Sequence, residues 1–165
     1  MLADESCKSL WNSGALRLQS RFPALGRDLM SNVTILLADD NAAVLSHVGK
    51  MLSKQTNYMV VGAINDGTTV VRECLRLKPD LAILDISMGM VSGIDIALQL
   101  RELGCNAKII FLTVHEDRDY MSAAIGAGGS AYVVKSRLST DLLPGIEAAL
   151  ANRLFVSANL MSERE

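Results

Sequence analysis

The chain of 165 residues has about the length of one domain and is long enough to bury a single core, which excludes a large two-domain enzyme. Apolar residues make up 50% of it and charged residues 21%, a composition typical of folded globular proteins rather than of disordered ones. The formal net charge is −2 and no run of Lys and Arg occurs, so we expect no direct binding of nucleic acid by this chain.

Cysteine usage and the N-terminal region indicate the compartment. Cys7, Cys74 and Cys105 form no CxxC pair, no metal-binding spacing and no even-numbered disulfide framework, which favours a reducing environment. No apolar stretch approaches the roughly 20 residues that a membrane-spanning helix needs. Residues 1–32 lack a clear hydrophobic period and a secretory cleavage pattern. We therefore predict a cytoplasmic protein without a membrane segment and with a flexible N-terminal extension.

Five nearly continuous apolar runs follow this extension. They are Val33–Ala38, Tyr58–Ile64, Leu81–Leu84, Lys108–Thr113 and Ala131–Val134. Such runs are typical of strands that are covered on both faces, as in a parallel sheet. The stretches between them have helical spacing, for example Leu45, Val48 and Leu52. The alternation predicts an α/β fold over residues 33–152, with a doubly wound, five-stranded parallel sheet.

Polar residues mark where the helices begin, and the last residues form a separate segment. Asp66, Ser92 and Ser139 precede apolar-periodic stretches and are of the residue types that cap helix N-termini. Residues 153–165 follow the fifth predicted helix, and we expect them to form a tail or the start of a missing output domain.

The candidate functional residues lie at the ends of the predicted strands. Ligands of open parallel sheets bind beyond the carboxyl ends of the strands. In this chain those ends carry Asp39-Asp40, Asp85, Thr113 and Lys135. Three carboxylates that meet at one edge need a cation, and an all-oxygen ligand set favours Mg²⁺. An Asp carboxylate there can attack phosphorus while Lys135 offsets phosphoryl charge and Thr113 donates a hydrogen bond, so the predicted product is an aspartyl phosphate.

These residues carry a resemblance to a known family. Asp39-Asp40, Asp85, Thr113 and Lys135, with Gly93 and Tyr132, resemble the receiver domain of two-component response regulators, whose fold is a flavodoxin-like (βα)5 sandwich. The resemblance covers about residues 33–152. The stretches LTVHEDRDY and GGSAYVVKSRLSTDLLPGI are similar to receivers of the subfamily that usually carries a C-terminal helix-turn-helix domain.

The resemblance implies a role for each of these residues. Asp85 is the phosphoacceptor, and a sensor histidine kinase or a phosphotransfer protein donates the phosphoryl group. Mg²⁺ is held by Asp40 directly, by Asp39 largely through water, by Asp85 and by the backbone carbonyl of Ser87. Thr113 and Tyr132 form the switch pair, and Lys135 pairs with the phosphoryl group. Members of this family promote only their own phosphorylation and dephosphorylation, so no enzyme activity on other substrates is expected. The resemblance also allows a homodimer.

The sequence departs from the family pattern at two places. Gly89 stands where relatives commonly have Pro, so we expect a less constrained loop and altered phosphorylation kinetics. Because the sequence ends at Glu165, we expect this chain to carry no helix-turn-helix domain after the fifth helix, although residues 161–165 resemble the opening of one.

Other interpretations remain open at this point. A Mg²⁺-dependent phosphatase or phosphotransferase of the haloacid dehalogenase type also uses a strand-end Asp, but it needs a second Asp at the position of Ser87 and usually a cap domain. A receiver-like scaffold that binds partners without phosphorylation is opposed only by the completeness of the site. His115 either borders the active site or is a solvated loop residue.

Overall fold

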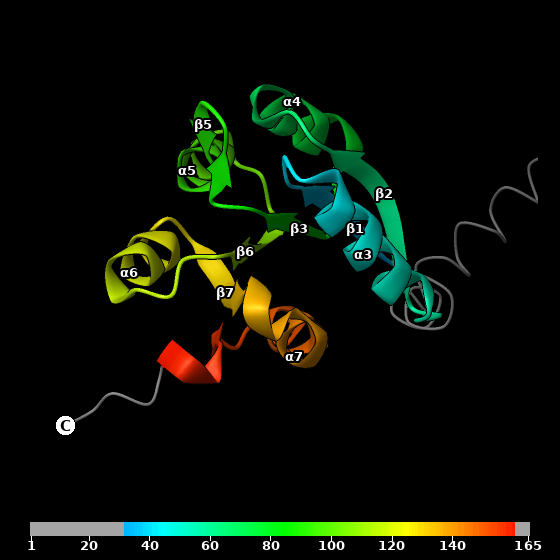
Figure 1. Ribbon diagram of the computed structural model, residues 1–165. Helices are drawn as coiled ribbons and strands as arrows, with labels where there is room; N and C mark the ends of the chain where they lie inside the picture. The colour runs from blue at the N-terminus through cyan, green and yellow to red at the C-terminus, as the bar shows by residue number, and fades with distance from the viewer. Residues whose placement is uncertain (1–31, 161–165) are drawn as a thin grey trace, which may run out of the picture. The chain divides into compact units, whose positions relative to one another are not determined.

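The structure is a computed structural model that describes residues 32–160. Its centre is a sheet with the strand order β2-β1-β3-β6-β7-β8, in which every neighbouring pair is parallel (Figure 1). The strands of this sheet are β1 (Val33–Ala38), β2 (Tyr58–Ile64), β3 (Leu81–Leu84), β6 (Lys108–Thr113), β7 (Gly129–Val134) and β8 (Phe155–Val156).

Helices cover both faces of the sheet. One face is covered by α4 (Gly67–Leu77), α5 (Gly93–Glu102) and α6 (Arg118–Gly126), and the other by α3 (Ala42–Ser53) and α7 (Leu138–Leu150) (Figure 1). Two short 3₁₀ turns, η1 (Lys135–Arg137) and η2 (Ala158–Leu160), flank α7 and β8. The predicted doubly wound α/β fold is confirmed.

Burial on both faces explains why the strands are almost entirely apolar. In β1, Leu36 and Ala38 pack on the side of α4 and α5, whereas Ile35 and Leu37 pack on the side of α3 and α7. All of these side chains are at most 2% exposed. Since successive side chains of a strand point to opposite faces, both faces must be apolar, and the in/out alternation of a half-exposed strand disappears.

The structure adds strands that the sequence pattern does not predict. The five predicted strands are present, and β8 extends the sheet beyond β7 with Ala131 opposite Phe155 and Tyr132 opposite Val156. The segment after β3 forms a small antiparallel hairpin of β4 (Ser87–Met88) and β5 (Val91–Ser92). Each of these three extra strands has only two residues, too short for a periodic signal.

Two of the three predicted helix caps are confirmed and one is wrong. The Asp66 side chain accepts a hydrogen bond from the Thr68 N–H at 2.9 Å, and Ser92 accepts one from the Ile94 N–H at 3.2 Å. Ser139 is not a cap, because α7 begins one residue earlier, directly after η1. The Leu138 N–H donates to the Lys135 carbonyl of η1, so the 3₁₀ turn itself satisfies a donor at this helix start.

Some expectations concern residues outside the described range. The predicted extension lies almost wholly in residues 1–31, and the motif that resembles the opening of a further domain lies in residues 161–165; neither is described by the structure. Among residues 32–160, no helix combines the length and apolar character that crossing a membrane requires.

Candidate functional site

The site lies where the chain reverses its direction across the sheet. From β1 the chain passes to β2 on one side, and then to β3 on the other side of β1. Ala38 and Leu84 are register partners, and the Asp85 N–H donates a 2.8 Å hydrogen bond to the Ala38 carbonyl. Asp39 and Asp85, the next residues of their strands, are therefore neighbours. This is the topological switch point at which open α/β sheets bind their ligands.

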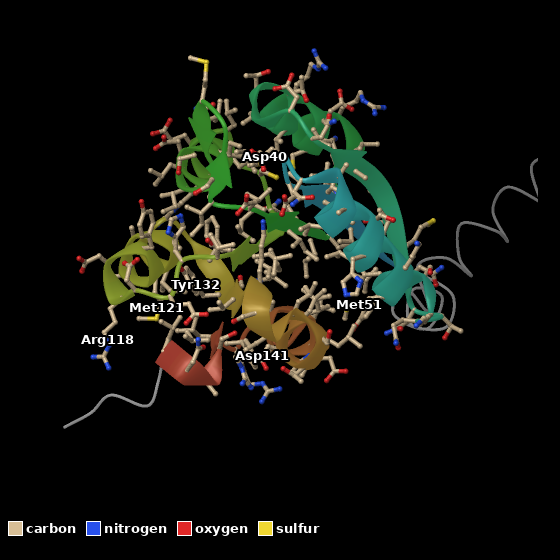
Figure 2. The ribbon with its side chains drawn as sticks, viewed as in Figure 1. Asp40, Met51, Arg118, Met121, Tyr132 and Asp141 are labelled. Carbon is tan, nitrogen blue, oxygen red and sulfur yellow. The ribbon has the colours of Figure 1, made fainter. Side chains whose placement is uncertain are left out.

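Three carboxylates meet at this edge. One oxygen each of Asp39, Asp40 and Asp85 lies within 4.8 Å of the others. Asp39 and Asp85 are 3% and 4% exposed, whereas Asp40 is exposed. Figure 2 shows Asp40 at the edge of the sheet where β1 ends. The sequence prediction that these acids converge is confirmed by this geometry.

Lys135 bridges the two buried acids. Its Nζ lies 2.7 Å from Oδ2 of Asp39 and 3.3 Å from Oδ2 of Asp85. The last residue pair of β6 and β7 is Thr113 with Val134, so the strand register places Lys135 beside Thr113 at the same edge. Three carboxylates and one ammonium leave a formal charge of −2, which a divalent cation would neutralise.

The environment of Asp85 disfavours its ionised form. Burial raises the pKa of the Asp85 carboxyl above its usual range, because the charged form loses hydration. The Lys135 ammonium acts in the opposite direction, and the Asp39 carboxylate adds to the rise in pKa by repulsion. A further cation bound beside Asp85 would therefore stabilise its ionised form.

The donor set fits a hard divalent cation. Oδ1 of Asp85 is buried and accepts no hydrogen bond from any residue in the described range 32–160. Oδ2 of Asp39 is also buried, and its contact with Lys135 is an ion pair without hydrogen-bond geometry. A buried carboxylate oxygen without a hydrogen bond costs free energy unless a cation binds to it. Carboxylate oxygens are the ligands that Mg²⁺ prefers, so these residues fit the predicted ion.

The hairpin after Asp85 differs from the loop expected around Gly89. Gly89 has a φ of 60° and occupies the first of the two turn positions between Met88 and Val91, the pattern of a type II′ turn. Proline, whose φ is held near about −65°, cannot adopt this conformation. The segment expected to be less constrained thus forms a paired hairpin that glycine permits, and the altered phosphorylation kinetics stay a prediction.

Gly93 brings the start of α5 against the strand end. A Cβ built on Gly93 would lie 2.0 Å from the carbonyl oxygen of Asp85. The Gly93 N–H donates a 2.8 Å hydrogen bond to the Ile86 carbonyl. Only a residue without a side chain allows this approach, so Gly93 fixes the backbone that presents the Asp85 carboxylate.

A chain of hydrogen bonds joins Thr113 to Tyr132 through His115. The fully buried Thr113 hydroxyl accepts from the His115 N–H at 3.1 Å, and the Tyr132 hydroxyl donates to the His115 carbonyl at 3.0 Å. The pKa of the Tyr132 phenol is raised, chiefly by burial, while a hydrogen bond with the Thr113 side chain acts in the opposite direction. The two residues predicted as a switch pair are therefore linked through the backbone of His115.

The His115 ring also contacts Ser87, two residues after Asp85. Its Nε2 lies 2.8 Å from the Ser87 hydroxyl, and its ring stacks on Tyr120 with 3.9 Å between the ring centroids. The contact with Ser87 favours the interpretation in which His115 borders the site, and its side chain is half-buried. The pairing with Ser87 carries no sequence signal, because Ser87 lies in β4 and His115 follows β6, and only the folded sheet brings these segments together.

Comparison with known proteins identifies the family. The model of the response regulator receiver domain matches residues 35–147. The chain belongs to this family. The regulatory protein PdtaR of Mycobacterium tuberculosis is 36% identical over 117 residues, which are 71% of this chain and 56% of that protein. The uncharacterized transcriptional regulatory protein YvfU of Bacillus subtilis is 29% identical over 128 residues, 78% of this chain and 64% of that protein. The chain thus spans 56% to 64% of the length of these relatives.

Solved structures of receivers superpose on the chain. A LuxR-family response regulator from Aurantimonas is 28% identical with a TM-score of 0.76, over 81% of this chain and 95% of the other. The isolated REC domain of RcsB from Salmonella enterica, determined with the phosphomimetic BeF3⁻, is 25% identical with a TM-score of 0.74, over 82% of this chain and 100% of the other. The flavodoxin-like receiver fold predicted from the sequence is confirmed.

Proposed function

We propose that this receiver domain accepts a phosphoryl group on Asp85 from a sensor histidine kinase or a phosphotransfer protein. The observation that carries the proposal is the pair of buried, adjacent carboxylates of Asp39 and Asp85 with Lys135 between them, 2.7 and 3.3 Å away. This arrangement combines a nucleophile, a cation for the phosphoryl oxygens and further acidic oxygens for a metal ion.

In the transfer, a carboxylate oxygen of Asp85 forms a bond to phosphorus while the bond from phosphorus to the donor's imidazole nitrogen breaks. The freed imidazole takes up a proton from solvent. Lys135 is already within 3.3 Å of the Asp85 carboxylate and offsets the charge of the incoming oxygens. When bound by Asp39, Asp40, Asp85 and the backbone carbonyl of Ser87, Mg²⁺ supplies the remaining positive charge at these oxygens.

Switching is proposed to start at Thr113. Its hydroxyl accepts a bond from the His115 N–H in the present arrangement and donates instead to a phosphoryl oxygen once Asp85 is modified. Tyr132 is bound to the His115 carbonyl and responds to the displaced backbone. The altered face around α6, β7 and α7 then changes affinity for a partner or for a second copy of the chain.

Three further properties complete the proposal. The domain acts in the cytoplasm, which suits the free thiols of Cys74 and Cys105. It promotes its own phosphorylation and dephosphorylation and has no other substrate. The phosphatase alternative is less suited to the site, since the position two residues after Asp85 is Ser87, whose hydroxyl contacts His115.

Incubation with acetyl phosphate and Mg²⁺, followed by intact-mass measurement, tests this function. We expect an adduct of about 80 Da that requires Mg²⁺, because the domain holds its own catalytic groups and needs only a reactive phosphoryl donor. Asp85→Asn should abolish the adduct. Asp95→Asn, the same change at an exposed acid on α5, should retain it.

The result separates the alternatives. Absence of an adduct in the parent protein with Mg²⁺ favours the unphosphorylated scaffold. An adduct that persists in Asp85→Asn would place the phosphoacceptor at another residue. Steady release of phosphate over many turnovers from a general phosphomonoester would favour the phosphatase.

A further inference from the structure

Ser157 connects the C-terminal segment, here residues 154–160, to the strand that carries the switch residue. Its backbone N–H donates a 3.0 Å hydrogen bond to the Tyr132 carbonyl. Its side-chain oxygen accepts a 3.1 Å hydrogen bond from the Val134 N–H. Ser157 is fully buried. It is bonded to β7 through its backbone at Tyr132 and through its side chain at Val134, on either side of Val133.

The same hydroxyl reaches the start of α7. Ser157 and Asp141 share a side-chain hydrogen bond, and Asp141 is in turn held by Arg137 at 2.8 Å and by the Thr140 hydroxyl at 2.9 Å. Asp141 is only 6% exposed. Since the hydroxyl accepts from Val134, its proton is available to the Asp141 carboxylate. One small side chain thus joins β7, α7 and the C-terminal segment.

Apolar contacts place the rest of the segment over Tyr132. Leu160 is 7% exposed and belongs to the same buried cluster as Tyr132, and Val156 packs against that cluster. Figure 2 shows Met121 on α6 and Asp141 on α7 on either side of the segment. Met121 also lines an open groove of about 560 Å³ beside Val156 and Leu160. The groove is lined by side chains of both α6 and the segment.

The contacts form an unbroken path from the acidic site to the segment. Thr113 is bonded to the His115 N–H, Tyr132 to the His115 carbonyl, and Ser157 to the Tyr132 carbonyl. Lys135, which holds Asp39 and Asp85, directly follows the residue whose N–H is bonded to Ser157. These contacts give a change at Thr113 or Lys135 a physical route to the two bonds that Ser157 makes to β7.

We infer that phosphorylation of Asp85 loosens the C-terminal segment from β7, and that Ser157 is the positioning residue that couples the two. The bonds of Ser157 fit β7 while Asp85 is unmodified, so repositioning Tyr132 and Val134 weakens them. The mobility of residues 154–160 would then depend on whether Asp85 is phosphorylated, and a partner that contacts the segment could respond to this difference. This inference rests on the proposed function and adds to it the element that responds.

Hydrogen–deuterium exchange of residues 154–160 tests the coupling in the full chain, with and without acetyl phosphate and Mg²⁺. We expect exchange in the segment to become about fivefold faster or more on phosphorylation. Ser157→Ala should raise the basal exchange and remove the dependence on phosphorylation. Leu160→Ala should also raise basal exchange but keep the dependence, because it weakens packing and leaves both bonds to β7 intact. The matched control Ser139→Ala, at an exposed position of α7, should behave as the parent.

A second measurement covers the case in which Ser157→Ala leaves the segment fully open. Coupling is reciprocal, so a segment that is already loose should raise the affinity for BeF3⁻ with Mg²⁺ in calorimetry, by about fivefold, in Ser157→Ala but not in Ser139→Ala. Equal affinities in all variants overturn the coupling, as does unchanged or slower exchange in phosphorylated parent protein. Intact mass on the same samples distinguishes the failures: an adduct without altered exchange refutes this inference alone, whereas no adduct refutes the proposed function and the inference with it.

Discussion

Gly93 lies closer to the backbone of Asp85 than a residue with a side chain could. A Cβ built on Gly93 would lie 2.0 Å from the carbonyl oxygen of Asp85 and 2.9 Å from the carbonyl carbon of Asp85. We expect Gly93→Ala to lower the free energy of unfolding by about 2 kcal/mol or more, because backbone rather than a flexible side chain must move. Phosphorylation of Asp85 should slow as well, since the same backbone aims its carboxylate.

Urea denaturation checks this prediction against Gly49→Ala. Gly49 lies within α3, and a Cβ there meets nothing within 4 Å. Alanine should therefore stabilise that helix by about 0.5 to 1 kcal/mol. If both substitutions give the same midpoint as the parent, the close approach of Gly93 to Asp85 is not a constraint on the fold.

The residues of the acidic site could be predicted because each ends a strand. Asp39, Asp85 and Lys135 follow apolar runs directly, and the parallel sheet forces such positions to one edge. Ser157 could not be predicted in this way. It follows a strand of two residues, and its importance comes from the Val134 N–H and Asp141, partners that only tertiary packing brings to it.

At the scale of elements, the sequence predicts those that bury long apolar runs and fails for those held by local geometry. The five main strands and their helices carry such runs. In contrast, the hairpin of β4 and β5 depends on the positive φ of Gly89, and the start of α7 depends on the preceding turn η1. Neither feature produces a hydrophobic period in the sequence, so neither can be predicted from the hydrophobic pattern.

The junction of η1, α7 and β8 gives a prediction on pH. Burial alone would raise the pKa of Asp141, but hydrogen bonds from Arg137, Ser157 and Thr140 outweigh it and hold the pKa below its usual range. A carboxyl with a lowered folded-state pKa stabilises the fold above its unfolded-state pKa, and this contribution is lost as the pH falls through the folded-state pKa.

We therefore expect Asp141→Asn to cost about 1 to 3 kcal/mol near neutral pH and progressively less below about pH 4. Urea denaturation of parent and variant across this range measures the difference. Asp95→Asn, at an exposed acid of α5, serves as control and should show little cost at any pH. A cost that stays constant down to the lowest pH would show that the charge of Asp141 is not what stabilises this junction.

For the molecule as a whole, the acidic site is a source of repulsion that the fold tolerates. Asp39 and Asp85 are almost fully buried, and Lys135 is the only cation paired with them within the described residues 32–160. Asp40 is exposed, and the N-terminus of α3 is capped by Asn41 and not by Asp40. Its charge therefore adds repulsion without an offsetting contact in the metal-free protein.

This imbalance predicts a response of global stability to Mg²⁺. An ion that binds only the assembled site stabilises the fold by mass action, by about 1.4 kcal/mol at tenfold excess over its dissociation constant. The expected rise in the melting temperature is roughly 3 to 6 °C. Asp40→Asn should be as stable as the parent or more stable in chelator, and should lose most of the rise in Mg²⁺. The two effects have opposite signs, which a general loss of stability could not produce.

Thermal melts in chelator and in millimolar Mg²⁺ make this comparison, with Glu102→Gln as a control at an exposed acid at the end of α5. The control should keep the full increment, because removal of a distant charge alters the net charge equally but leaves the ligand set intact. A parent protein that shows no shift at any Mg²⁺ concentration would mean that the three carboxylates do not form a Mg²⁺ site. In that case the repulsion among Asp39, Asp40 and Asp85 would be relieved by Lys135 alone, and the scaffold without phosphorylation would become the better account of the molecule.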